Sequence, residues 1–135
     1  MMNTHDIQKI QIILQADERL LLHILLSSDG VIQRLGSGRL DNKEYQLMSD
    51  NVGGVFFEDL LKSLPAGFWE SEGRYSDPNF RGQRLGLSIS VIENGHEHSF
   101  QIVYGSESSG PPDDIVAFVV RAKDLTEEWY QGLKK

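Results

Sequence analysis

The sequence contains no cysteine among its 135 residues. This absence excludes disulfide bridges, zinc sites built from thiolates, iron–sulfur clusters and cysteine nucleophiles. No apolar run reaches the roughly 18–20 residues that span a bilayer, and the longest, Leu20–Leu26, is interrupted by His23. The N-terminus also lacks the basic start and apolar stretch of a secretory signal. We therefore expect a cytoplasmic protein that has no membrane contact, with a processed secreted chain as the alternative.

Motifs of known catalytic chemistry are also missing. There is no Gly-x-Ser-x-Gly nucleophile turn, no Gly-x-x-x-x-Gly-Lys-Ser/Thr phosphate loop and no dinucleotide fingerprint. Asp113 and Asp114 are adjacent acids that suit the positive start of a helix, and they diverge rather than face each other as glycosidase carboxylates do. The sequence therefore predicts no catalytic residue, no cofactor and no enzymatic activity, and an enzyme built from loop residues is the least favoured hypothesis.

Basic residues are scarce. Thirteen Lys and Arg stand against 20 Asp and Glu, which gives a net charge of −7. Between Glu93 and Glu128 there are eight acidic and two basic residues, a net of −6. A nucleic-acid-binding surface needs concentrated positive charge to displace counterions from phosphates. We therefore expect no nucleic-acid partner. The excess of acids either keeps the protein in solution or steers a basic partner.

The residues that are present suit one globular domain over 1–135, with 39% hydrophobic and 24% charged residues. Ile7–Gln15, Leu20–Leu26 and Val31–Leu35 are predicted to be strands, because they are rich in alternating or continuous apolar residues. Asp29-Gly30 predicts the turn between the last two. The continuous run Leu20–Leu26 indicates a strand covered on both faces. One helix over residues 7–26 is the alternative.

The most specific local signal is Asn94-Gly95 between two alternating segments in 84–104. A two-residue turn of this type fixes the register of a hairpin, with Glu93 opposite His96. Stepping outward gives one apolar face and one mostly polar face, as a sheet covered on one side requires. The predicted apolar-face pairs are Val91 with His98, Ile89 with Phe100, Leu87 with Ile102, and Leu85 with Tyr104.

Two helices complete the predicted fold. Asp50-Asn51 would cap a helix from about Gly53 to Leu64, before Pro65. Pro111-Pro112-Asp113-Asp114 would open a second helix that covers the hairpin, with Thr126 capping a separate last turn. The order predicts an α+β fold, a mainly antiparallel sheet of about five strands with two helices packed on one face.

The histidines offer one metal-binding hypothesis. His96 and His98 are two residues apart on a strand and so share a face, where they could hold one ion. No third ligand is apparent, so we expect an exposed pair near a turn and no metal, with His96 and His98 as the alternative metal ligands. His23 is expected to be a buried neutral histidine bonded to a neighbour.

The segment from Pro65 to Gln83 is a long connection without clear periodicity, and long ordered loops are often functional. Residues 74–84 carry a net charge of +2 in this acidic chain. Arginine together with aromatic residues concentrates binding energy at protein interfaces. The alternative is that the rings fold over the sheet while the arginines face water. The predicted partner-binding residues are Phe68, Trp69, Arg74, Tyr75, Phe80, Arg81 and Arg84.

These observations favour a small acidic, non-catalytic binding protein that acts through contacts with another protein. The general layout resembles that of small bacterial inhibitor and immunity-type proteins, in which acidic α+β domains block a partner enzyme. The resemblance is one of architecture and implies a similar role. The alternative hypothesis is a small-ligand or metal-binding domain.

Overall fold

The three N-terminal apolar segments form antiparallel strands, as their patterns predict. The computed structural model describes residues 6–78 and 81–133. In it, β1 (Ile7–Ala16) pairs with β2 (Arg19–Ser27), and β2 pairs with β3 (Val31–Leu35). Gly30, with φ of 96°, allows the predicted turn between β2 and β3. The helical alternative for this region is wrong.

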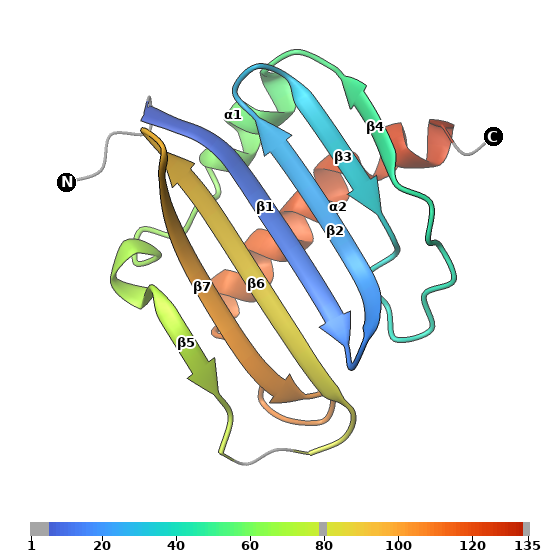
Figure 1. Cartoon of the computed structure of the whole chain (residues 1–135), viewed down its shortest axis with the longest axis vertical. Helices are drawn as coiled ribbons and strands as arrows, with labels where there is room; N and C mark the ends of the chain where they lie inside the picture. The colour runs from blue at the N-terminus through green and yellow to red at the C-terminus, as the bar shows by residue number, and fades with distance from the viewer. Residues whose placement is uncertain (1–5, 79–80, 134–135) are drawn as a thin grey trace.

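The hairpin of β6 (Arg84–Glu93) and β7 (His96–Gly105) has the predicted register at every pair from Glu93 opposite His96 outward. Asn94 and Gly95 have φ values of 49° and 81°, the positive values that this tight turn needs. β6 also pairs antiparallel with β1, which joins the hairpin to the N-terminal strands. β1 and β6 are therefore inner strands of one sheet (Figure 1).

The sheet is larger than predicted, because one further strand lies at each edge. The order is β4-β3-β2-β1-β6-β7-β5, with β4 (Met48–Asn51) and β5 (Gly73–Ser76) outermost. β5 runs parallel to β7, so the seven-stranded sheet is mixed. The prediction of about five antiparallel strands describes the five inner strands and misses both edges.

Both predicted helices exist, with different ends. α1 (Val55–Leu61) begins after Gly54, whose position has no side-chain cap hydrogen bond. The capping role of Asp50-Asn51 is wrong, since both residues belong to β4. α2 (Asp113–Leu133) is one continuous helix. Thr126 does not cap a separate turn, because its hydroxyl donates to the Ala122 carbonyl oxygen inside α2 at 2.9 Å.

The two helices pack on the same face of the sheet, as predicted, and lie behind it in Figure 1. β2 alternates, with Leu22, Ile24 and Leu26 in the core while Leu25 and His23 are half-buried on the other face. The prediction that this strand is covered on both faces is therefore wrong. No helix in the described ranges is long and apolar enough to cross a membrane. The sheet supplies most of the core, whose fully buried members include Ile12, Ile24, Ile32, Ile89, Val91, Leu60, Phe68 and Ala122.

Candidate functional site: the open face of the sheet

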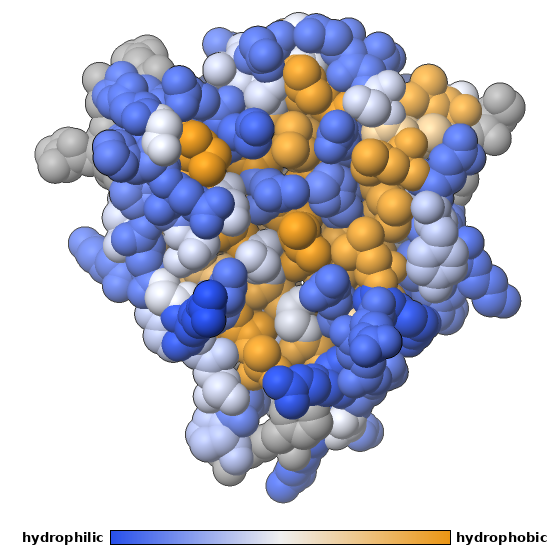
Figure 2. Space-filling view, in the orientation of Figure 1, coloured by the Kyte–Doolittle hydropathy of each residue, from blue (hydrophilic) through white to orange (hydrophobic). Residues whose placement is uncertain are grey.

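The sheet face that points away from the helices, here called the open face, is toward the viewer in Figures 1 and 2. Within the described part of the chain, no second layer covers it. It is made of every second residue of each strand, so polar side chains alternate with the core residues. Figure 2 shows hydrophobic groups exposed between the polar ones. The half-buried apolar side chains on this face include Ile13, Leu25, Val31, Ile92 and Val103.

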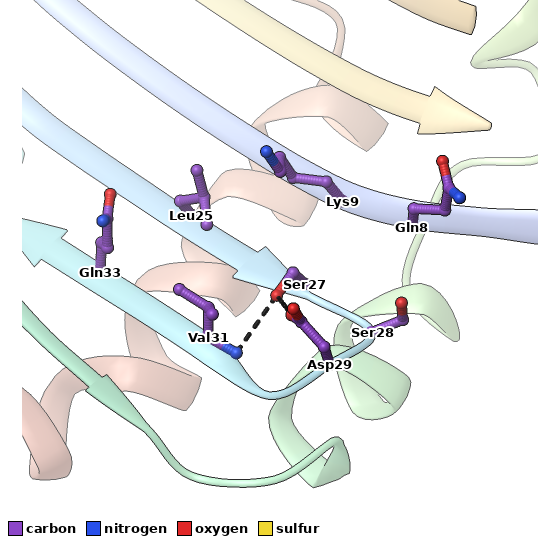
Figure 3. Close-up of a pocket in the computed structure, with 8 residues that line it drawn as sticks. All are labelled: Gln8, Lys9, Leu25, Ser27, Ser28, Asp29, Val31 and Gln33. Carbon is purple, nitrogen blue, oxygen red and sulfur yellow. Dashed lines mark hydrogen bonds between the residues drawn. The ribbon is translucent and has the colours of Figure 1, made fainter. Parts of the chain in front are cut away.

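One hollow of the open face lies beside the β2–β3 turn (Figure 3). The Ser27 hydroxyl donates to the Asp29 carboxylate and accepts from the Val31 backbone N–H at 3.1 Å. The bond from Ser27 is the main cause that holds the pKa of Asp29 below its usual value. Both side chains are thus occupied in shaping the turn. Eight residues line the hollow: Gln8, Lys9, Leu25, Ser27, Ser28, Asp29, Val31 and Gln33.

A second depression of the open face, here called the Gly86 hollow, lies near the start of β6. Gly86 pairs with Gln15 of β1 and with Val103 of β7. A Cβ built on Gly86 would meet no heavy atom within 4 Å, so the fold itself leaves room for a side chain there. Around Gly86, the hollow is lined on the open face by Ile13, Gln15, Arg74, Ser88, Gln101 and Val103.

Two arginines border the Gly86 hollow. Arg74 is opposite Gln101 in the β5–β7 pairing. Arg84 precedes Gly86 by two residues and so shares its face. Both side chains are exposed, and neither guanidinium forms a hydrogen bond or ion pair with the residues that the structure describes. No described side chain therefore neutralises the positive charge on this part of the face.

The predicted partner-binding residues divide into two groups. Phe68 is fully buried in the hydrophobic core and is no part of the surface. Trp69 is half-buried, with its ring centroid 5.2 Å from that of Phe68. Tyr75 is 43% exposed, and its ring packs 5.3 Å from that of Phe100. The exposed side chains of the set are those of Arg74, Tyr75, Arg81 and Arg84, and Phe80 lies outside the described residues.

The two histidines near the hairpin turn, His96 and His98, differ in their exposure. His96 is exposed, whereas His98 is half-buried. His98 Nδ1 lies 2.5 Å from Glu72 Oε1, and its Nε2 lies 3.6 Å from Glu93 Oε1. The contacts fasten the connection before β5 to the hairpin. In the described ranges, no group of three or more His, Cys, Asp or Glu side chains could hold a metal ion.

His23, predicted as a buried histidine with a bonded neighbour, is half-buried on the open face. Its Nε2 lies 3.3 Å from the side-chain oxygen of Gln33 on the adjacent strand. This contact links two strands and involves no acid that would pair with the ring. The residue therefore belongs to the polar part of the open face.

Sequence reasoning missed a buried arginine on the covered face. Arg34 is 0% exposed and follows the core residue Ile32 by two positions in β3. Its Nη2 is 3.0 Å from Glu127 Oε1, and its guanidinium carbon is 4.6 Å from the centre of the Tyr130 ring. The only signal in the sequence was its alternation with Ile32. Its guanidinium also donates to the Gly36 and Lys123 carbonyl oxygens and to the Thr126 hydroxyl.

A comparison with protein-family models and with curated proteins finds no match for this chain.

Proposed function

We propose that this chain is a non-catalytic protein-binding domain that holds its partner against the open face. The observation that carries the proposal is the uncovered face of a seven-stranded sheet, on which half-buried apolar side chains lie between polar ones. A sheet face that only meets water is usually polar. Apolar groups set in a polar surround are instead typical of protein interfaces.

Two polar pairs of the described residues are engaged within the fold, which supports binding rather than catalysis. Ser27 and Asp29 hold a turn, and His98 with Glu72 fastens a connection to the hairpin. A catalytic site needs a nucleophile or base that is free to meet a substrate, with an orienting neighbour. These pairs are used within the fold. Blocking a partner by contact alone, as an inhibitor or immunity-type protein does, requires only the surface.

The test obstructs the open face at the centre of the sheet. Ser88→Tyr with Ser90→Tyr would place two rings on β6, where both native side chains are half-buried. Ala117→Tyr with Val120→Tyr would place two rings on the exposed side of α2 and is the matched control. Tyrosine suits strands and is tolerated on helix surfaces, so both variants should fold.

Each protein is immobilised and exposed to lysate of its source cells, and captured proteins are compared. We expect a protein held by the unmodified chain and by the α2 variant, and lost with the β6 variant. Thermal unfolding checks that both variants are folded. Capture that survives the β6 substitutions, or that is lost equally with both variants, would contradict binding on the open face.

A further inference from the structure

The half of the open face around the Gly86 hollow is positive in an acidic protein. The chain as a whole has a net charge of −7. Asp17 lies nearby, since its backbone N–H donates to the Arg84 carbonyl oxygen at 3.3 Å, but no ion pair joins their side chains. The register places two arginines and no acid on this half of the face, among Gln15, Arg74, Ser76, Arg84, Gly86, Ser88, Gln101 and Val103.

Gly86 adds a second observation. A glycine inside a strand weakens it and often marks a place where another backbone approaches closely. Gly86 does not have a positive φ, and a Cβ there would meet nothing within 4 Å. Neither the backbone conformation nor the packing within the fold therefore requires glycine at this position. The close approach of a partner backbone to the strand would require it.

The spacing of the two arginines limits what can pair with both. Arg74 is opposite Gln101 of β7, and Gln101 is opposite Ser88 of β6, so Arg74 lies two strands from Ser88. Arg84 is four positions from Ser88 along β6. With strands about 4.8 Å apart and a rise of about 3.3 Å per residue, the two Cα atoms are roughly 15 Å apart. An extended chain covers a similar distance in about four residues. Arginine pairs with carboxylates through two parallel hydrogen bonds.

We propose that the Gly86 hollow binds an extended acidic segment of a protein partner. Two carboxylates, about four residues apart, pair with Arg74 and Arg84 while the backbone of the segment crosses from β7 to β6 beside Gly86. This inference rests on the proposed function and adds the chemistry of the partner. A nucleic acid is disfavoured, because a chain of phosphates needs a concentrated basic surface, and this half of the face offers two arginines.

The probe is a synthetic peptide of nine residues, blocked at both ends, with Glu at the third and seventh positions and Thr elsewhere. Amide NMR spectra of the full chain follow its titration. We expect saturable shifts at Gly86, Ser88 and Gln101, which weaken as salt screens the charges. The matched peptide with Lys in place of Glu should leave these amides unchanged. No shift at millimolar peptide, or equal shifts with the Lys peptide, would overturn the proposal.

Two variants test the named contacts. Arg74→Gln with Arg84→Gln should weaken binding of the Glu peptide about tenfold, as expected for the loss of two exposed ion pairs. The matched control, Lys62→Gln with Arg121→Gln, removes one cation just after α1 and one from α2, where Arg121 pairs with Asp59, and should bind as the unmodified chain does. Equal weakening by both double variants would show a general effect of net charge and would overturn the assignment to these arginines.

Gly86→Val tests the passage of a backbone over the strand. Valine has open space at this position and suits a strand, so the fold should keep its stability. Its branched side chain would keep the segment away, and we expect binding of the Glu peptide to be lost. Unchanged affinity would refute the close approach.

A thymidine oligonucleotide of nine nucleotides tests the class of partner. Stronger amide shifts with this oligonucleotide than with the Glu peptide would overturn the choice of a protein partner.

The lysate experiment separates this inference from the proposed function. If the Ser88→Tyr, Ser90→Tyr variant loses its captured protein and the Arg74→Gln, Arg84→Gln variant retains it, the open face binds a partner without the acidic contacts. The inference then fails while the proposed function stands. If both variants retain the captured protein, both fail.

Discussion

Arg34 and Arg84 lie on opposite faces of the same sheet and have opposite surroundings. Arg34 is 0% exposed and donates to acceptors in α2 and in the loop after β3. Arg84 is exposed and has no side-chain hydrogen bond or ion pair within the described ranges. A charge taken out of water must be compensated by the protein, whereas a charge left in water need not be. The chain therefore uses Arg34 to hold itself together and leaves Arg84 available.

The same contrast applies to the two faces as wholes. On the covered face, the buried Arg34 is joined to a partner that lies far away in the sequence, Glu127 of α2. On the open face near Gly86, polar and charged groups are left to solvent. Arg74 and Arg84 have no side-chain partner among the residues that the structure describes, which makes this part of the surface a candidate for binding. Substitutions of matched residues on the covered face and on exposed parts of the molecule test whether they differ in this way.

The largest loss of stability is expected for Arg34→Ala. The substitution leaves a cavity and removes the donor that satisfies the Gly36 carbonyl and the Thr126 hydroxyl. We expect the free energy of unfolding to fall by about 3–4 kcal/mol, measured by urea denaturation. The 40% exposure of the Glu127 side chain limits the loss, because that carboxylate can remain hydrated.

Arg84→Ala is the matched control, and its free energy of unfolding should change by less than about 0.5 kcal/mol. Arg34→Met, which refills part of the volume without hydrogen bonds, should lie between the two. Similar losses for Arg34→Ala and Arg84→Ala would mean that the two arginines do not differ in structural role. The comparison of the two faces would then be wrong.

The inner strands were predictable from the sequence because their signals are local. β6 and β7 alternate between apolar and polar residues on both sides of Asn94-Gly95, so the turn alone fixed their register. The helix α2 was predictable from its proline and acid start and from Ile115, Phe118 and Ala122 at helical spacing. Local chemistry and tertiary packing agree in these elements.

The edge strands were not predictable, because neither has a buried face to impose a pattern. Every residue of β5 is exposed, and β4 has no fully buried residue. Such strands form because a neighbouring edge offers backbone partners, which a local pattern does not record. The segment 65–83 could be recognised as unusual, and buried Phe68 with exposed Arg74 fits the alternative in which rings fold over the sheet while arginines face water. The local pattern could not decide between that alternative and a wholly exposed binding segment.

The role of Arg34 lay equally beyond the sequence. Its alternation with Ile32 suggests a core position, but its acceptors in α2 are 89 to 93 positions further along the chain. The pairing becomes visible only when α2 is packed against β3. Long-range polar contacts of this kind depend on the geometry of the whole fold.

A smaller effect is expected for Tyr130→Phe. The buried Tyr130 hydroxyl accepts a hydrogen bond from the Gly36 backbone N–H at 3.0 Å. Removing the oxygen leaves a buried donor unsatisfied, which should lower the free energy of unfolding by about 1–2 kcal/mol. Tyr75→Phe is the control at the exposed edge, where water replaces the bond to the Ser71 carbonyl, and its loss should be near zero. Equal losses in urea denaturation would contradict the distinction.

The smallest effect is the pH dependence that Glu127 contributes. Burial alone would raise its pKa, but hydrogen bonds from Gln131 and Arg34 and the positive charges of Arg34 and Lys123 hold it below the usual value. The unfolded chain then takes up this proton first as pH falls, so the stabilisation is present above the ordinary pKa and is lost in acid. Partial exposure and screening limit it to less than about 1 kcal/mol.

Glu127→Gln should therefore lower the free energy of unfolding near neutral pH by more than it does in acid, as measured by urea denaturation at a series of pH values below 7. Glu128→Gln removes the same charge from the next position without removing the contact to Arg34, which Glu127 makes. The pH dependence should change with the first variant and not with the second. A difference between Glu127→Gln and the unmodified chain that stays constant from neutral pH into acid would show that the buried Arg34 does not depend on this carboxylate for its charge compensation.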